Sequence, residues 1–109
     1  MKIERYEKEV VRRICSGVLS YEIINQLLSA PNRIEVKSCS AVYDLNIYHD
    51  SLPEELVVCD SSIEGSYKNS KVGFIVTIHN RCLSLECYAK GSGTLLQGMR
   101  NGEVKISKT

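Results

Sequence analysis

The chain has 109 residues, which is enough for one domain with a modest hydrophobic core. Hydrophobic residues make up 43% of it and charged residues 25%, a balance that excludes general disorder. The formal net charge of +1 excludes a strongly basic nucleic-acid binder and a strongly acidic mimic of nucleic acid, so we predict no nucleic-acid partner.

Apolar runs in the sequence are short, and LVVC at 56–59 is among the longest. No run is long enough to cross a bilayer, and the charged start MKIERYEKEVVRR lacks the apolar segment of a secretion signal. Five cysteines at irregular spacings argue against a disulfide framework. We therefore expect a cytoplasmic protein with reduced thiols and no membrane partner.

Residues 3–30 are predicted to be helical. Apolar side chains recur there at three- and four-residue steps, with charged residues between them. Glu9 precedes Arg13 by four residues, the favourable order for an ion pair along a helix. Ser20 is suited to cap a second helix, and Pro31 should end it.

Residues 33–107 are predicted to form an antiparallel sheet of about five or six strands. The longest alternation runs from Cys39 to Ile47, and its odd-numbered residues are expected to face the helices. The parity changes before Cys39, which predicts a bulge or turn near residues 37–38. Further strands are expected at 56–59, 72–79, 82–89 and 104–107, and the polar segment 60–71 is predicted to be the main loop. The whole chain, 1–109, is thus predicted to be a single α+β domain, with one or two N-terminal helices on an antiparallel β-meander.

Two cysteines and a histidine lie near the predicted turn of the segment GFIVTIHNRCLSLECYAKG, residues 73–91. His79 and Cys82 lack the further ligands that a tetrahedral zinc site needs, and Cys82 and Cys87 should point to opposite faces of a strand. We expect no metal site, and we expect Cys87 to be a core thiol. A small enzyme that uses Cys82 or Cys87 with His79 stays an alternative, because only the fold can bring a base to a thiol.

The segment KGSGT at 90–94 has neither the spacing nor the following helix of a phosphate-binding loop, so no cofactor is expected. Tyrosine is enriched, with six residues against one phenylalanine and no tryptophan. Exposed tyrosines and loop carboxylates are typical of a partner-binding surface. The candidate partner-binding residues are Glu54, Glu55, Asp60, Glu64, Tyr67 and Tyr88.

Three segments together resemble small bacterial immunity proteins of polymorphic and contact-dependent toxin systems. They are RYEKEVVRRI at 5–14, LPEELVV at 52–58 and LSLECYAKG at 83–91, and Glu86 matches a glutamate of the last motif. The resemblance implies a non-enzymatic protein that binds a cognate toxin domain, often a nuclease, and blocks it in the cytoplasm. The final segment SGTLLQGMRNGEVKIS departs from the acidic, proline-bearing ending that such families often have.

A second function class fits the same residues. A structural or regulatory interaction domain would also lack a catalytic constellation, and it could self-associate through an exposed sheet edge. The sequence leaves this alternative open, together with the oligomeric state and the identity of the partner.

Overall fold

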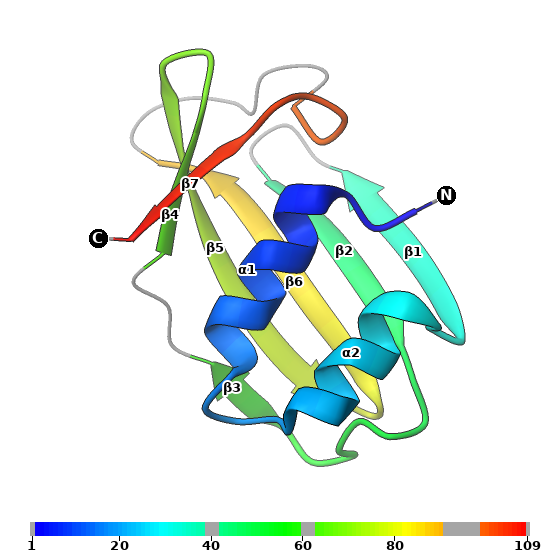
Figure 1. Ribbon diagram of the computed structural model, residues 1–109. Helices are drawn as coiled ribbons and strands as arrows, with labels where there is room; N and C mark the ends of the chain where they lie inside the picture. Colours follow the sequence, from blue (N-terminus) through cyan, green and yellow to red (C-terminus); the bar gives the residue numbers. More distant parts are fainter. Residues whose placement is uncertain (1, 39–41, 60–62, 91–98, 109) are drawn as a thin grey trace.

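The computed structural model describes residues 2–38, 42–59, 63–90 and 99–108. Helices α1 (Arg5–Cys15) and α2 (Tyr21–Ser29) come first. The strands are β1 (Arg33–Ser38), β2 (Val42–Tyr48), β3 (Val57–Cys59), β4 (Ile63–Tyr67), β5 (Ser70–His79), β6 (Cys82–Ala89) and β7 (Lys105–Lys108). This arrangement confirms the predicted α+β class, with the helices at the N-terminal end (Figure 1).

The sheet is antiparallel throughout its described part, in the order β1-β2-β6-β5-β4-β7. Strand β3 lies off this path and pairs with the later part of β5. Hairpins join β1 to β2, β4 to β5 and β5 to β6, as in a meander. The pairings of β2 with β6 and of β4 with β7 join strands that are distant in sequence, and they close the hairpins into one sheet.

Local signals explain where both helices begin and end. The Glu4 N–H donates to Oε1 of Glu7 (2.7 Å) at the start of α1, and Glu9 pairs with Arg13 (2.9 Å) as predicted. The Ile23 N–H donates to the Ser20 hydroxyl (3.2 Å), which confirms the predicted cap of α2. Helix α2 ends at Ser29, and Ala30, which precedes Pro31, is its C-cap, as predicted.

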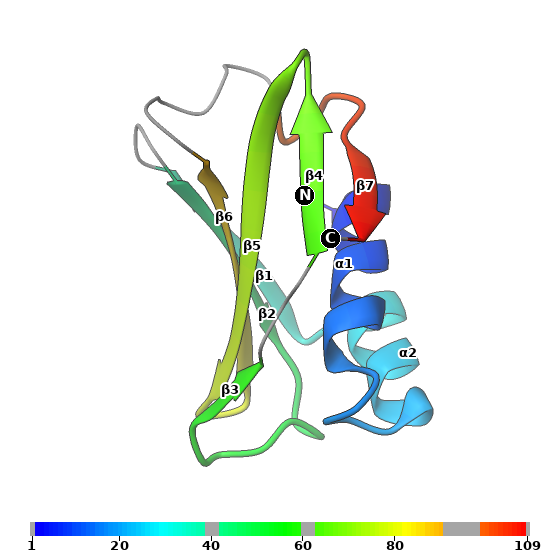
Figure 2. The ribbon, with the colours of Figure 1, turned by 90° about the vertical axis from the view of Figure 1, so that its left-hand side faces the viewer.

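Both helices lie on one face of the sheet (Figure 2). The hydrophobic core fills the space between the helices and the sheet. The odd-numbered residues of β2 and β6 point into this core, and Leu45, Leu83 and Leu85 are fully buried. Val10 and Leu27 meet them from the helices and are equally buried. The predicted core face of the long alternation is therefore confirmed for its described residues, Tyr43, Leu45 and Ile47.

Two tight hairpin turns need backbone conformations with positive φ. Lys68 and Asn69 (φ 48° and 68°) join β4 to β5, and Asn80 and Arg81 (φ 52° and 59°) join β5 to β6. Two-residue hairpins favour this left-handed geometry because it matches the twist of the flanking strands. Asparagine tolerates the geometry better than most residues do. The turn predicted around residues 79–81 is confirmed at 80–81.

The prediction of one long loop at 60–71 is wrong. Strand β4 occupies residues 63–67 and pairs with both β5 and β7, so the segment is largely sheet. Tyr67 is 8% exposed and belongs to the core. Its ring lies against Gly102, where an added Cβ would stand 2.4 Å from Cε1 of Tyr67. The sequence hid this strand because only Ile63 and Tyr67 bring apolar side chains to the core, while the buried position between them is the glycine Gly65.

The long strand predicted from Cys39 is shorter in the structure. Strand β1 extends through Ser38, and β2 begins at Val42. Residues 37 and 38, where a bulge or turn was expected, belong to β1 instead, and Cys39 lies outside the described residues. The register pairs Arg33 with Tyr48 and Ser38 with Tyr43.

Candidate functional site: the open face of the sheet

One face of the sheet is covered by the two helices, and no described element covers the other (Figure 2). We call this second face the open face. The strand register arranges its side chains in rows that run across the strands. The three rows used below are Arg33–Tyr48–Cys82–His79, Lys37–Asp44–Glu86–Ile75 and Val42–Tyr88–Gly73–Glu64.

Tyr88 is held across the sheet in the third row. Its ring lies over Gly73 on the neighbouring strand, where an added Cβ would stand 2.3 Å from Cζ of Tyr88. The missing side chain of Gly73 thus makes the space in which the ring lies. The ring is half-buried, so one of its surfaces packs on backbone while the rest faces solvent. A tyrosine fixed in this way presents contact area with little conformational freedom left to lose.

Asp44 and Glu86 stand directly opposite one another in the central row. Both are half-buried, and neither forms an ion pair with a described lysine or arginine. Other open-face carboxylates are paired: Glu35 with Arg33 (3.1 Å) and Glu64 with Lys90 (2.7 Å). The middle of the open face therefore carries two neighbouring carboxylates without a bound cation.

Exposed apolar residues lie on the β5 and β3 side of the open face, and Ile75 among them is next to the carboxylate pair. Ile75 follows Glu86 in the central row and is 40% exposed. Val58 on the edge strand β3 is 64% exposed, as is Leu56 just before that strand. Exposed apolar side chains that lie beside a fixed tyrosine are typical of interface centres.

The end row holds the thiol and imidazole that the sequence analysis considered for catalysis. Cys82 lies directly opposite His79, and the Arg33 guanidinium stacks 4.0 Å from the ring centroid of Tyr48. Burial raises the pKa of Cys82, which disfavours the thiolate that a nucleophile requires. Cys87 points to the opposite face, as predicted, and is fully buried in the core.

The predicted acidic residues do not form one cluster. Glu54 lies beside the β5–β6 turn, where its carboxylate accepts from Nε and Nη2 of Arg81 (3.2 and 3.1 Å). Glu55 is exposed nearby, and Asp60 lies outside the described residues. Glu64 lies on the open face opposite Gly73, far along β5 from Glu54. The Lys90 ammonium, with help from Lys71, holds the pKa of the Glu64 carboxyl below its usual range.

A buried polar network joins α1 to β2 and to the segment before β7. The Glu7 carboxylate is fully buried and accepts from the hydroxyl of Tyr43 (2.8 Å) and from Nε and Nη2 of Arg100 (3.0 and 3.1 Å). The Tyr6 and Tyr43 hydroxyls are also in contact. Burial raises the pKa of Glu7, and the Arg100 charge and the hydrogen bonds oppose that rise. Since each carboxylate oxygen is satisfied, we interpret this network as structural.

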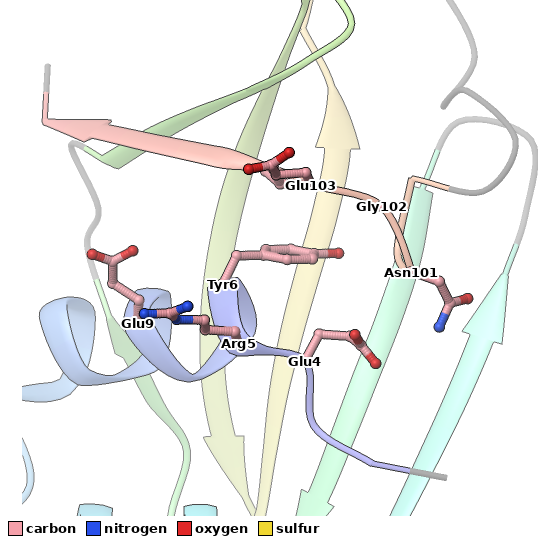
Figure 3. Close-up of a pocket in the computed structure, with 8 residues that line it drawn as sticks. Glu4, Arg5, Tyr6, Glu9, Asn101, Gly102 and Glu103 are labelled. Carbon is pink, nitrogen blue, oxygen red and sulfur yellow. The ribbon is translucent and has the colours of Figure 1, made fainter.

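A hollow of about 480 Å³ lies between α1 and the residues that precede β7 (Figure 3). It is lined by Glu4, Arg5, Tyr6, Glu9, Asn101, Gly102, Glu103 and Val104. One Glu4 carboxylate oxygen, Oε2, is buried without a hydrogen-bond partner. The lining contains no serine, cysteine or histidine that would pair a nucleophile with a base. The open face is therefore the stronger candidate site.

Within residues 2–38, 42–59, 63–90 and 99–108, no three histidine, cysteine, aspartate or glutamate side chains gather as a metal site would require. No described helix is long and apolar enough to cross a membrane. Comparison of the chain with protein-family models, with curated proteins and with solved structures gave no match. The resemblance to immunity proteins thus stays a prediction.

The sequence analysis named Tyr88 as a candidate but not Asp44, which lies opposite Glu86 on the open face. Both lie on the polar parity of their strands, which is readable from the alternation. The pairing of β2 with β6 is not readable, because many residues separate these strands and no turn fixes their register. Glu86 was noticed through the motif, but its carboxylate neighbour appears only in the assembled sheet.

Proposed function

We propose that this protein is a non-enzymatic cytoplasmic immunity protein that binds a cognate toxin domain through the open face and blocks it. The observation that carries the proposal is the Tyr88 ring, held over Gly73 beside the carboxylates of Asp44 and Glu86. The motif LSLECYAKG, on which the resemblance rests, contributes both Glu86 and Tyr88. Aromatic side chains contribute much of the binding energy at protein interfaces, and charges that meet complementary charges contribute specificity.

The experiment is a pull-down of the toxin domain encoded immediately upstream, followed by calorimetry and by a growth assay with the toxin expressed. We expect one-to-one binding and protection of the cells. Tyr88→Ala should weaken binding about tenfold or more, as the loss of an interface aromatic does. Tyr21→Ala is the matched control, because Tyr21 is 76% exposed on α2 and belongs to the other side of the molecule.

Gly73→Ala tests the placement of the ring without removing it. The new methyl group would overlap Tyr88, so the ring must leave its position, while the strand geometry tolerates alanine. Affinity should fall almost as far as in Tyr88→Ala. The proposed function is wrong if the wild-type protein neither binds the upstream domain nor protects against it.

Self-association through a sheet edge is the second candidate. Among the described strands, β3 pairs with β5 alone, and it carries the exposed Val58 with Leu56 just before it. An apolar, half-open edge of this kind is suited to meet another strand. Light scattering at micromolar concentration distinguishes the candidates, since a stable dimer that Val58→Lys dissociates would favour self-association.

A further inference from the structure

We infer that the open face recognises a basic protein surface and that Asp44 and Glu86 together receive one arginine or lysine side chain of it. This inference rests on the proposed function for the identity of the partner, but the site itself is argued from the sheet. Directly opposite residues in an antiparallel pair have Cβ atoms roughly 5 Å apart. Both carboxylates point to the open face, because the residues on either side of them are buried in the core.

In the free protein, no described lysine or arginine forms an ion pair with either of these like charges. Like charges directly opposite one another destabilise a sheet. Lys37 lies opposite Asp44 on the edge strand, but it forms no ion pair with it among the described residues. On the same face, Glu35 and Glu64 each have a cation within 3.1 Å. The difference singles out Asp44 and Glu86 as the carboxylates that are open to a cation from outside.

The surroundings of the pair favour an organic cation. Tyr88 lies two residues from Glu86 on the same face of β6, and its ring lies over Gly73 on the β5 side. A guanidinium bound to Glu86 would therefore have an aromatic ring as its neighbour along β6. Ile75, on the other side of Glu86, can pack against the aliphatic part of the same side chain. A planar guanidinium between two carboxylates forms hydrogen bonds to both, which a point charge does less well.

An inorganic cation fits the site less well. Calcium takes six to eight oxygen ligands, and magnesium requires near-octahedral geometry. Two monocarboxylates on a flat sheet supply too few oxygens, and no third acidic or histidine ligand joins them among the described residues. The complementary surface is therefore a protein surface with exposed arginine or lysine.

The experiment follows the backbone amide signals of ¹⁵N-labelled protein during titration with a hexa-arginine peptide at low ionic strength, with hexa-glutamate as the probe control. We expect signals of residues 44, 86 and 88 to shift most and to saturate. In the double variant Asp44→Asn, Glu86→Gln the affinity should fall about tenfold or more. Glu35→Gln is the matched control, because Glu35 lies on the same face but is already paired with Arg33. Thermal unfolding checks that each variant folds.

The inference is overturned if the largest shifts fall on other acidic residues, such as Glu54 or Glu103, or if the double variant binds the peptide as the wild type does. The same variants are then measured against the upstream toxin domain. If that domain does not bind the wild-type protein, the proposed function fails while the peptide titration still decides the site. If the domain binds but the double variant binds equally well, the inference fails and the proposed function stands.

Discussion

The two faces of the sheet use the same alternating strands for different purposes. On the helix side, neighbouring residues such as Leu45 and Leu85 face one another and are fully buried. On the open face, one position along, Asp44 faces Glu86, and neither forms an ion pair with a described lysine or arginine. Two cross-strand pairs that are adjacent along β2 and β6 therefore have opposite effects, since one stabilises the fold and the other destabilises it. The contrast places the stabilising pairs on the helix side, and it is the reason that we propose partner recognition on the open face.

The largest expected difference between the faces is in thiol reactivity. Cys15 and Cys87 are fully buried on the helix side, and burial raises the pKa of Cys15 to about 12. Such thiols react only after unfolding, which makes modification about a thousandfold slower or more. Cys82 on the open face is half-buried, so its thiol should react while the protein stays folded. Pulse labelling with N-ethylmaleimide at pH 7, read by peptide mass spectrometry, tests this. Modification of Cys87 as fast as Cys82 would show that the core face is misassigned.

The tyrosines on the two faces should differ almost as clearly. Tyr67→Ala removes a buried ring that packs on Gly102, and we expect it to lower the free energy of unfolding by about 3–5 kcal/mol. Tyr88→Ala on the open face should lower it by about 1 kcal/mol, because that ring is half exposed. Urea unfolding of both variants makes the measurement. Equal losses would mean that the two rings have equivalent packing roles.

Neighbouring residues on β6 give the most direct comparison. Leu85→Ala should lower the free energy of unfolding by about 2–5 kcal/mol, because Leu85 is fully buried among core side chains. Ser84→Ala, one position away on the open face, should change it by less than about 0.5 kcal/mol. Both variants can be measured by the same urea titration. A large loss in Ser84→Ala would argue that the open face is packed against something in the free protein.

The smallest expected effect concerns Glu64 and its dependence on pH. The Lys90 ammonium lowers the pKa of this carboxyl in the folded protein, so the folded state binds fewer protons than the unfolded state. The resulting stability is present above the ordinary carboxyl pKa and is lost as the pH falls through the lowered one. We expect the difference in melting temperature between the wild type and Glu64→Gln to shrink from pH 7 to pH 3. A difference that stays constant over this range would exclude the ion pair as its origin.

Much of the fold was predictable because its signals are local. The Ser20 cap, the end of α2 before Pro31 and the buried parity of Leu45 and Leu85 all follow from spacing over a few residues. Strand β4 was not predictable in the same way. Its sequence IEGSY is short and half polar, and it forms a strand because β5 and β7 pair with it on both sides.

The candidate site likewise has some features that are local in sequence and others that depend on distant strands. Tyr88 was predictable from its parity, but the space that holds its ring depends on Gly73 in another strand. The ring of Tyr67 likewise packs against Gly102, a residue in a distant segment of the chain. A glycine in the sequence shows that another residue could pack closely against it, but only the tertiary fold shows which residue does so.

The pairing of Glu7 with Arg100 has a consequence for how the chain reaches its native state. The two residues are 93 positions apart, and the glutamate side of the pair is fully enclosed. Before Arg100 reaches its position in the fold, docking of α1 would bury the Glu7 carboxylate without its cation, which is strongly unfavourable. Docking of the first helix should therefore be among the later steps of folding, completed only when the segment that carries Arg100 has joined the sheet.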